Sequence, residues 1–315
     1  MLRAVSVILI CLSISAFSQS TEKYKSDYER FYKAEDLYEK GKFSAAEKEF
    51  NLFIKEYNEA NDPLFIKANY YAALSALKLY HGDAEILLLT FLKNYPESIY
   101  QEQVYLELGR FYYRKKKFDK TIEWLLKIDP YNLVKDYRDE YYFKLGYAYF
   151  REDQLKNARD AFFEIVHSPS PYQSPALYYY SHIAYTEKSY ETALEGFRNL
   201  ENDPNFSETV PYYIAQIYYL QGKYDKLLDY APTILDSSDA KNANQMSHLI
   251  GDAFYKVGKY DEAVPFLEEY NRKSETTRDE DYQLGYAYYK SGIYDKAIRT
   301  FSKVSSIEDE LGQIA

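Results

Sequence analysis

The four histidines are the first residues to test for chemistry, because imidazole serves both as a metal ligand and as a general base. They are His81, His167, His182 and His248. No two of them have the i, i+4 spacing that brings two ligands to one face of a helix. We therefore interpret each as an ordinary polar or packing residue, and we expect no catalytic, metal or cofactor site.

Acidic and basic side chains each gather once. Asp129, Asp136, Asp139 and Glu140 form the acidic group, and residues 114–117 form the basic run. Paired carboxylates act as acid and base only where burial separates their pKa values, and no apolar enclosure is evident, so we interpret the acidic group as a solvated loop. The basic run falls where a helix should end, and cations stabilise helix C-termini. We interpret it as a solvated corner, with a contact to an acidic partner as the alternative.

The overall charge and the missing motifs exclude several classes of function. The formal net charge is −10 at pH 7. Nucleic-acid affinity rests largely on neutralising phosphates, so we expect no nucleic-acid partner. The nucleophile elbow, the phosphate loop and the dinucleotide fingerprint are all missing from the sequence. We therefore expect a protein that is not an enzyme.

The first 20 residues differ from the rest of the chain. Residues 4–14 are mostly apolar, Arg3 is the lone charge, and small residues stand three and one positions before the expected cut. This pattern predicts a signal peptide over residues 1–18, cleaved between Ser18 and Gln19, and hence a periplasmic or secreted protein. The alternative is an uncleaved anchor, although the apolar run is shorter than the ~20 residues of a spanning helix.

The only cysteine lies within this leader. Cys11 follows Ile10, whereas a lipoprotein leader needs a small residue directly before its cysteine. We therefore expect no direct lipid anchor. After cleavage the chain would contain no cysteine, which excludes disulfides and thiol catalysis.

The elements that must position any functional side chain are pairs of helices. A turn, an aromatic residue, and then alanine and large apolar residues at helical spacing recur along the chain; Tyr260, followed by Ala263 and Leu267, is one copy. The anchor positions are 43, 81, 118, 155, 190, 224, 260 and 294, which lie 34–38 residues apart. Upstream glycines such as Gly109 and Gly251 would let the paired helices approach closely. A two-helix period near ~34 residues predicts stacked hairpins.

With these turns, glycines and anchors, the chain resembles the tetratricopeptide repeat family over about residues 27–304. The resemblance implies an all-α, right-handed superhelical solenoid of about eight helix-turn-helix hairpins. Three copies depart from the pattern: the second has Ala72 and His81, the third has Thr121 and the fifth has Ser181 in place of the usual residues.

Proline and serine mark a looser joint at residues 168–171. We therefore expect repeats 1–4 in residues 19–167, and repeats 5–8 with the start of a ninth in residues 168–315. Ser305 and Glu308 have the capping-box spacing that would open this ninth hairpin.

The family resemblance also implies a binding surface. It places partner-contacting side chains on the first helix of each hairpin, including positions 5 and 12 when the glycine is position 8. Carried onto this sequence, these positions predict a partner-binding groove formed by Phe31, Tyr38, Tyr113, Phe143, Phe150, Tyr178, Tyr185, Tyr212, Tyr219, Tyr255, Tyr282 and Tyr289. The second repeat contributes Asn69 and Ala76 instead. Aromatic rings dominate recognition hot spots, so an extended peptide or a partner helix is the expected ligand; alternatively, the rings pack between hairpins as core.

Bulky runs end two of the hairpins, at residues 50–57 and 91–96. In this respect the chain resembles exported periplasmic tetratricopeptide proteins of the outer-membrane assembly and Tol–Pal-associated type. The resemblance implies a non-enzymatic scaffold or adaptor that binds peptides or protein subunits in cell-envelope assembly, secretion or maintenance, within a peripheral envelope complex. The incomplete ninth hairpin favours an alternative, a sensory or regulatory region of a longer protein with a C-terminal effector domain. A third hypothesis, an enzyme whose chemistry lies beyond residue 315, has no support in the sequence.

Overall fold

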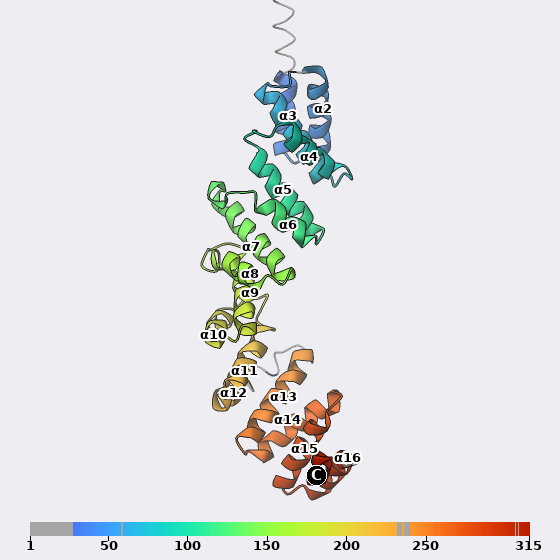
Figure 1. Cartoon of the computed structure of the whole chain (residues 1–315), viewed down its shortest axis with the longest axis vertical. Coiled ribbons are helices and arrows are strands. Elements are labelled where there is room, and N and C mark those ends of the chain that lie inside the picture. The colour runs from blue at the N-terminus through green and yellow to red at the C-terminus, as the bar shows by residue number, and fades with distance from the viewer. Residues whose placement is uncertain (1–27, 58, 232–234, 236–239, 306, 308) are drawn as a thin grey trace, which may run out of the picture. The chain divides into compact units, whose positions relative to one another are not determined.

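The computed structural model describes residues 28–57, 59–231, 235, 240–305, 307 and 309–315. The predicted signal peptide, its cleavage site and Cys11 lie outside these residues, so the leader stays a prediction. Throughout the described ranges the regular structure is helical, and the helices follow one another in sequence order (Figure 1). None of these helices is both long enough and apolar enough to cross a bilayer.

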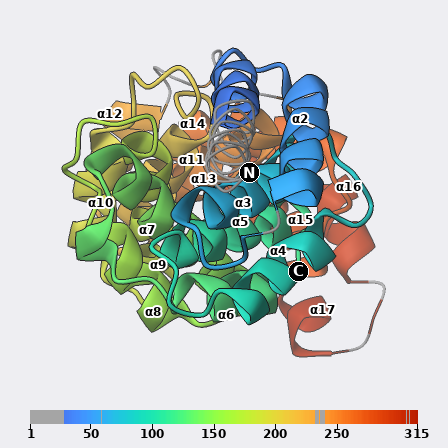
Figure 2. The same cartoon turned by 90° about the horizontal axis from the view of Figure 1, so that it is seen from above.

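The chain divides into two compact units, Met1–Glu152 and Asp153–Ala315. The first unit contains a helix over residues 28–39, then α2 (Phe43–Tyr57), α3 (Pro63–Lys78), α4 (Ala84–Asn94), α5 (Gln101–Arg114), α6 (Phe118–Leu125), the short 3-10 helix η1 (Pro130–Asn132) and α7 (Lys135–Arg151). Helices α3 and α5, the first helices of two successive hairpins, lie beside each other (Figure 2).

The second unit continues the alternation of longer and shorter helices. It contains α8 (Leu155–Phe163), α9 (Gln173–Thr186), α10 (Tyr190–Arg198), α11 (Val210–Leu220), α12 (Tyr224–Tyr230), α13 (Ala240–Lys256), α14 (Tyr260–Lys273), α15 (Arg278–Lys290), α16 (Tyr294–Val304) and α17 (Glu310–Ile314). Within each unit the helices pack on their neighbours along the chain. This all-α solenoid of hairpins confirms the predicted fold class, while the division of repeats at residues 167 and 168 stays a prediction.

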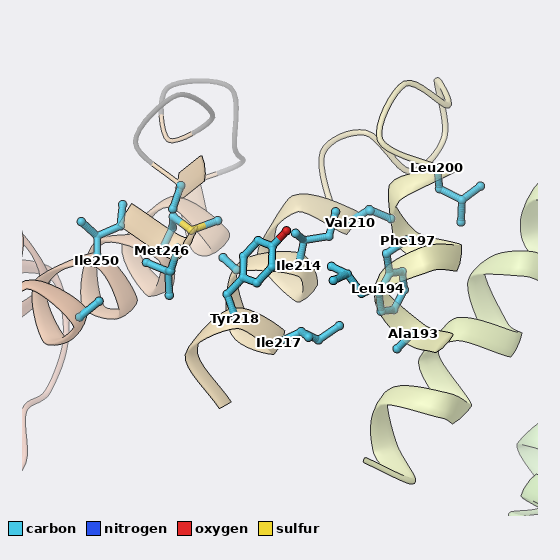
Figure 3. Packing of buried hydrophobic residues seen from close by; sticks show 14 of the residues in the cluster. Ala193, Leu194, Phe197, Leu200, Val210, Ile214, Ile217, Tyr218, Met246 and Ile250 are labelled. Atoms are coloured by element: carbon cyan, nitrogen blue, oxygen red, sulfur yellow. The ribbon is translucent and has the colours of Figure 1, made fainter. Parts of the chain in front are cut away.

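The core is shared between successive hairpins. In the second unit, side chains from α10, α11 and α13 meet along the stack (Figure 3), and Phe197, Ile214, Met246 and Ile250 are each 0% exposed. Burying a side chain of this size contributes about 1.5–3 kcal/mol. Because each cluster joins neighbouring hairpins, each hairpin is stabilised mainly by its contacts with the hairpins next to it.

The C-terminal helix begins later than predicted. Ser305 is the C-cap of α16, and α17 starts after Asp309, whose Oδ1 accepts a hydrogen bond from the backbone N–H of Gly312 at 2.8 Å. The predicted capping box at Ser305 is therefore wrong, because an aspartate closer to the helix satisfies its first amide groups. Glu308, the other member of that box, lies outside the described residues.

Each first helix ends in a left-handed corner, and glycine is not always the residue there. Gly258 has φ +77° and an added Cβ would have nothing within 4 Å, whereas Lys188 adopts φ 62° with a side chain. A left-handed non-glycine residue costs about 1–2 kcal/mol. We expect Gly258→Ala to lower the free energy of unfolding by about 1 kcal/mol and Lys188→Gly to raise it by about 0.5 kcal/mol, as measured by urea unfolding. Equal and same-signed shifts would contradict this explanation.

Candidate functional site

The corners fix the register of the repeats. Their left-handed residues are Gly41, Tyr80, Lys116, Asp153, Lys188, Gly222, Gly258 and Gly292. At a typical corner, the N–H of the left-handed residue donates to the carbonyl three residues earlier, as from Gly222 to Tyr219 at 2.9 Å. Tyr219 is a position 12 residue, so counting back three from each corner identifies position 12 in every repeat.

This count corrects the second repeat by one residue. Its corner is Tyr80, whose N–H donates to the carbonyl of Leu77 at 3.2 Å. Position 12 is therefore Leu77 rather than Ala76, and position 5 is Tyr70 rather than Asn69. His81 is exposed and is not the anchor of this repeat. The error arose because Gly41 and Tyr80 lie 39 residues apart, against 34–37 residues between later corners.

The predicted groove residues are not equally accessible. Ten of them are half-buried: Tyr38, Tyr113, Phe143, Phe150, Tyr178, Tyr185, Tyr212, Tyr219, Tyr255 and Tyr282. Tyr289 is 53% exposed, and Phe31 is 0% exposed. The ring of Phe31 stands edge-on to those of Phe50 and Phe53, with centroids 5.8 and 5.5 Å apart. A fully buried ring offers no surface to a partner, so Phe31 belongs to the core and its assignment to the groove is wrong.

Position 12 tyrosines lie between two hairpins. The ring of Tyr219 stands edge-on to Tyr224 in its own hairpin, with centroids 5.6 Å apart, and its hydroxyl donates to Asp252 in the next hairpin. The edge-on contact recurs in Tyr38–Phe43, Tyr113–Phe118, Tyr255–Tyr260 and Tyr289–Tyr294. These rings therefore pack between helices and keep part of their surface exposed. Their role in partner binding stays a prediction.

In the second unit, the hydroxyl groups of the position 12 tyrosines form hydrogen bonds with polar side chains of the next hairpin. The hydroxyl of Tyr185 donates to Oε1 of Gln216 at 3.1 Å, and Nε2 of Gln216 donates to the hydroxyl of Tyr212 at 2.9 Å. One hairpin further, both carboxylate oxygens of Asp252 accept hydrogen bonds, from Tyr219 and from Gln283. Burial, with the hydrogen bond to Asp252, raises the pKa of Tyr219. A carboxylate bonded in this way is suited to joining hairpins rather than to proton transfer.

The first unit contains a groove of about 390 Å³, lined by the helix over residues 28–39, α3, α5 and the start of α7. Such a volume lies within the ~300–1,000 Å³ of small ligand sites. Its lining combines tyrosines with charged side chains, namely Tyr38, Tyr70, Tyr71, Tyr137, Glu107, Arg110 and Lys78, together with Leu74, Gln103, Leu106 and residues 132–134. Of the predicted groove residues it includes Tyr38 alone, and Tyr70 joins through the corrected register.

A buried ion network lies along one wall of this groove. Arg110 donates from Nε to Oε1 of Glu140 at 2.8 Å, from Nη2 to the other oxygen of Glu140, and from Nη1 to Oε1 of Glu107 at 2.6 Å. Lys144 lies 3.4 Å from Glu140. Burial alone would raise the pKa of Glu140, but the hydrogen bonds and charge of Arg110, with Lys144, hold that pKa below its ordinary value. The network connects α5 to α7.

These positions correct the interpretation of the acidic group. Glu140 and Asp139 lie on α7 rather than in a solvated loop, and Asp139 is only 4% exposed. No local pattern indicates this burial, because the cation that compensates Glu140 comes from the preceding hairpin. The basic run behaves as predicted: Arg114 ends α5, Lys116 has φ 56°, and all four side chains of the run are exposed.

The histidines occupy four unrelated environments. His248 stacks on Tyr270 with ring centroids 4.2 Å apart, and Nδ1 of His81 lies 3.3 Å from Glu47. Burial lowers the pKa of His182, and His167 is exposed. Among the described residues no group of three His, Cys, Asp or Glu side chains is placed to hold a metal ion. The expectation of no metal, cofactor or catalytic site stays a prediction.

Comparison with known proteins identifies one of the hairpins as a repeat of a known family. Residues 281–306, which cover most of α15 and α16, match the sequence pattern of the tetratricopeptide repeat family. No curated protein sequence matches the chain.

Several solved structures are similar to this chain. A tetratricopeptide repeat protein from Parabacteroides merdae is 14% identical with a TM-score of 0.46, over 84% of this chain and 99% of its own. The pilF protein of Pseudomonas aeruginosa is 16% identical with a TM-score of 0.47, over 68% of this chain and 96% of its own. The structure of Naa15/Naa10 bound to HypK-THB is 15% identical with a TM-score of 0.57, over 91% of this chain and 45% of the other. The last of these shows a shared fold.

The succession of packed helical hairpins defines the class of protein as a helical-repeat solenoid. Its eighth hairpin matches the tetratricopeptide repeat pattern, and the helical stack as a whole has the fold of a tetratricopeptide solenoid. This fold generally mediates interactions between proteins and typically forms non-catalytic scaffolds.

Proposed function

We propose that this protein is an exported, non-enzymatic adaptor that binds peptides or protein subunits during assembly, secretion or maintenance of the cell envelope. The observation that carries the binding role is the groove of the first unit, where four tyrosines and a buried ion network face one cavity. Aromatic rings offer large contact areas at low entropic cost, and fixed charges select among partners. Binding would be reversible docking on a preformed surface.

Support for export comes from the leader-like N-terminus and from the single cysteine, which falls within that leader. A mature chain without cysteine suits an oxidising compartment. One solved structure of similar fold, Naa15/Naa10 bound to HypK-THB, is a complex between proteins. For this chain we infer a peripheral place in an envelope complex, held by protein contacts rather than by lipid.

Site-specific photo-crosslinking in the cells that encode the protein tests the binding role. A photoreactive residue at Gln103 or Lys78, both exposed in the groove lining, should give one discrete cross-linked product. The same residue at Lys93, exposed on α4 outside the groove, is the matched control. Discrete products from Lys93 but none from the two groove positions would overturn the proposed function.

Export predicts a defined mature N-terminus. Protein recovered from the cell envelope should begin at Gln19, because the leader is expected to be cut after Ser18. N-terminal sequencing of the envelope and cytosolic fractions measures this. A deletion of residues 2–18 should leave the protein in the cytosol. Recovery of an intact N-terminus in the membrane fraction would instead support the uncleaved anchor.

A further inference from the structure

One carboxylate oxygen in the groove of the first unit lacks a partner. Glu107 is 8% exposed, and its Oε1 accepts from Arg110. Its Oε2 is buried and has no hydrogen-bond partner among the described residues. Leaving a buried acceptor unsatisfied is unfavourable, more so when it is charged. A ligand that brings a donor to this oxygen would remove that penalty.

Tyrosine rings line the same groove as Glu107. Burial, followed by the charge of Glu107, raises the pKa of Tyr38 to about 12 and also raises that of Tyr70. Both tyrosines line the groove together with Glu107. The ring of Tyr71 lies between them, 4.7 Å from Tyr38 and 5.2 Å from Tyr70 between centroids. Glu107 therefore forms part of the wall of a cavity that is also lined by tyrosine rings.

Two cationic side chains already lie over tyrosine rings of this groove. Nζ of Lys67 lies 5.8 Å from the ring centre of Tyr71, and the guanidinium of Arg110 lies 5.0 Å from that of Tyr137. Ring faces attract ammonium and guanidinium groups electrostatically. The surface thus has both features that recognise a basic side chain, a carboxylate acceptor and aromatic faces.

The resident cations do not satisfy the free oxygen. Arg110 directs its hydrogen bonds to Glu140 and to Oε1 of Glu107, so its charge is already matched. Lys78 is exposed at the end of α3, where it lines the groove. An anionic ligand would bring its charge against Oε2, whereas a cationic donor would neutralise it. The net charge of −10 would also attract basic partners over longer distances.

We propose that the groove of the first unit binds a lysine or arginine side chain of an extended peptide, whose N–H group donates to Oε2 of Glu107. This rests on the proposed function as a protein-binding adaptor and specifies the chemistry of its partner. The peptide backbone would lie across α3 and α5, with the tyrosine rings packing against the aliphatic part of the basic side chain.

Fluorescence anisotropy with defined peptides tests the ligand class on the mature chain, residues 19–315. The probe is a labelled peptide of four Ser-Lys repeats at physiological salt. Its matched competitors carry glutamine, glutamate or acetylated lysine in place of lysine. We expect the lysine peptide to bind about tenfold or more tightly than any of them, because hydrogen bonds to a charged group are the stronger ones. Equal binding of the acetylated or the glutamate peptide would overturn the proposal.

A matched pair of variants separates the site from bulk attraction. Glu107→Gln keeps an oxygen that can accept from Arg110 but removes the charge, and should weaken lysine-peptide binding about tenfold. Glu123→Gln removes an exposed charge of α6 and should leave binding unchanged. If both variants weaken binding equally, the attraction is non-specific and the proposal fails.

The wild-type protein provides an independent measurement if Glu107→Gln does not fold. Hydrogen exchange with the lysine peptide should protect α3 and α5, and the acetylated peptide should give no protection there. Protection confined to the second unit would overturn the site. Cross-links from the groove without lysine-peptide binding would overturn the ligand class alone, whereas absence of groove cross-links would overturn the proposed function itself.

Discussion

Replacing Arg110 with methionine should lower the free energy of unfolding of the first unit by about 3–5 kcal/mol at pH 7, the range found when one partner of a buried ion pair is removed. Arg110 donates to both Glu107 and Glu140, and the side chains of all three are at most 15% exposed. Methionine fills most of the volume but leaves two buried carboxylates without their shared cation. Urea unfolding, followed by hydrogen exchange in α5 and α7, measures the loss.

The loss should depend on pH in a defined direction. In the folded protein the pKa of Glu140 lies below its ordinary value of 4.5. Its stabilising contribution is therefore fully present above pH 4.5 and is lost as the pH falls through the folded pKa. In the Arg110→Met variant burial persists and Lys144 is the only cation of the network that remains, so the charged form of the Glu140 carboxyl is favoured less. The difference between wild type and variant should shrink below pH 4.5; a difference that grows there would contradict the ion network as its cause.

An exposed arginine supplies the control. Arg272 donates from Nη2 to Glu269 at 2.7 Å, but its side chain is 67% exposed. Exposed ion pairs contribute about 0–1 kcal/mol, so Arg272→Met should change the free energy of unfolding by less than about 1 kcal/mol. Losses of similar size in the two variants would show that shortening an arginine, rather than breaking the buried network, is responsible.

The fold was predictable because its determinants are local and repeated. The turn, the anchor and the alanine recur with each hairpin. In the degenerate second repeat the assigned positions were wrong by one residue, and this error did not affect the other repeats. That shift could have been avoided, since Tyr70-Tyr71 places aromatic rings one residue beyond the assigned position 5. The left-handed corner at Tyr80 has no sequence mark, because glycine is replaced by tyrosine there. Backbone geometry was needed to count this repeat correctly.

The candidate site was less predictable, because it depends on contacts between hairpins. Glu107 and Arg110 occupy spacing typical of a surface ion pair on one helix. Nothing in residues 101–114 indicates that Glu140, a hairpin later, covers them. Phe31 shows the opposite error: a position that faces the groove in the family pattern is enclosed here by Phe50 and Phe53. Family positions identify the face of a helix, and the neighbouring hairpin decides which residues of that face stay accessible.

The second large effect on stability is expected at Gly251, where the two helices of a hairpin approach each other closely. An added Cβ at Gly251 would lie 2.8 Å from Cδ2 of Leu267 and 3.1 Å from its backbone nitrogen. The side chain could move aside, but the backbone of α14 cannot without separating the hairpin. Gly251→Val should therefore lower the free energy of unfolding by about 3 kcal/mol, at the upper end of overpacking penalties. Gly82→Val is the control, because nothing lies within 4 Å of its added Cβ; it should change stability by about 0.5 kcal/mol, as a surface substitution.

A double-mutant cycle identifies the clash as the cause. Leu267→Ala alone should be destabilising by about 2–5 kcal/mol, since Leu267 is 2% exposed. In the Gly251→Val background the same truncation makes room for the new side chain, so its further effect should be smaller by about 1 kcal/mol or more. Strict additivity would mean that valine acts on the unfolded chain or on helix propensity instead. Because hairpins are stabilised by their neighbours, lost hydrogen-exchange protection should centre on α13 and α14 and diminish toward α9 and α10.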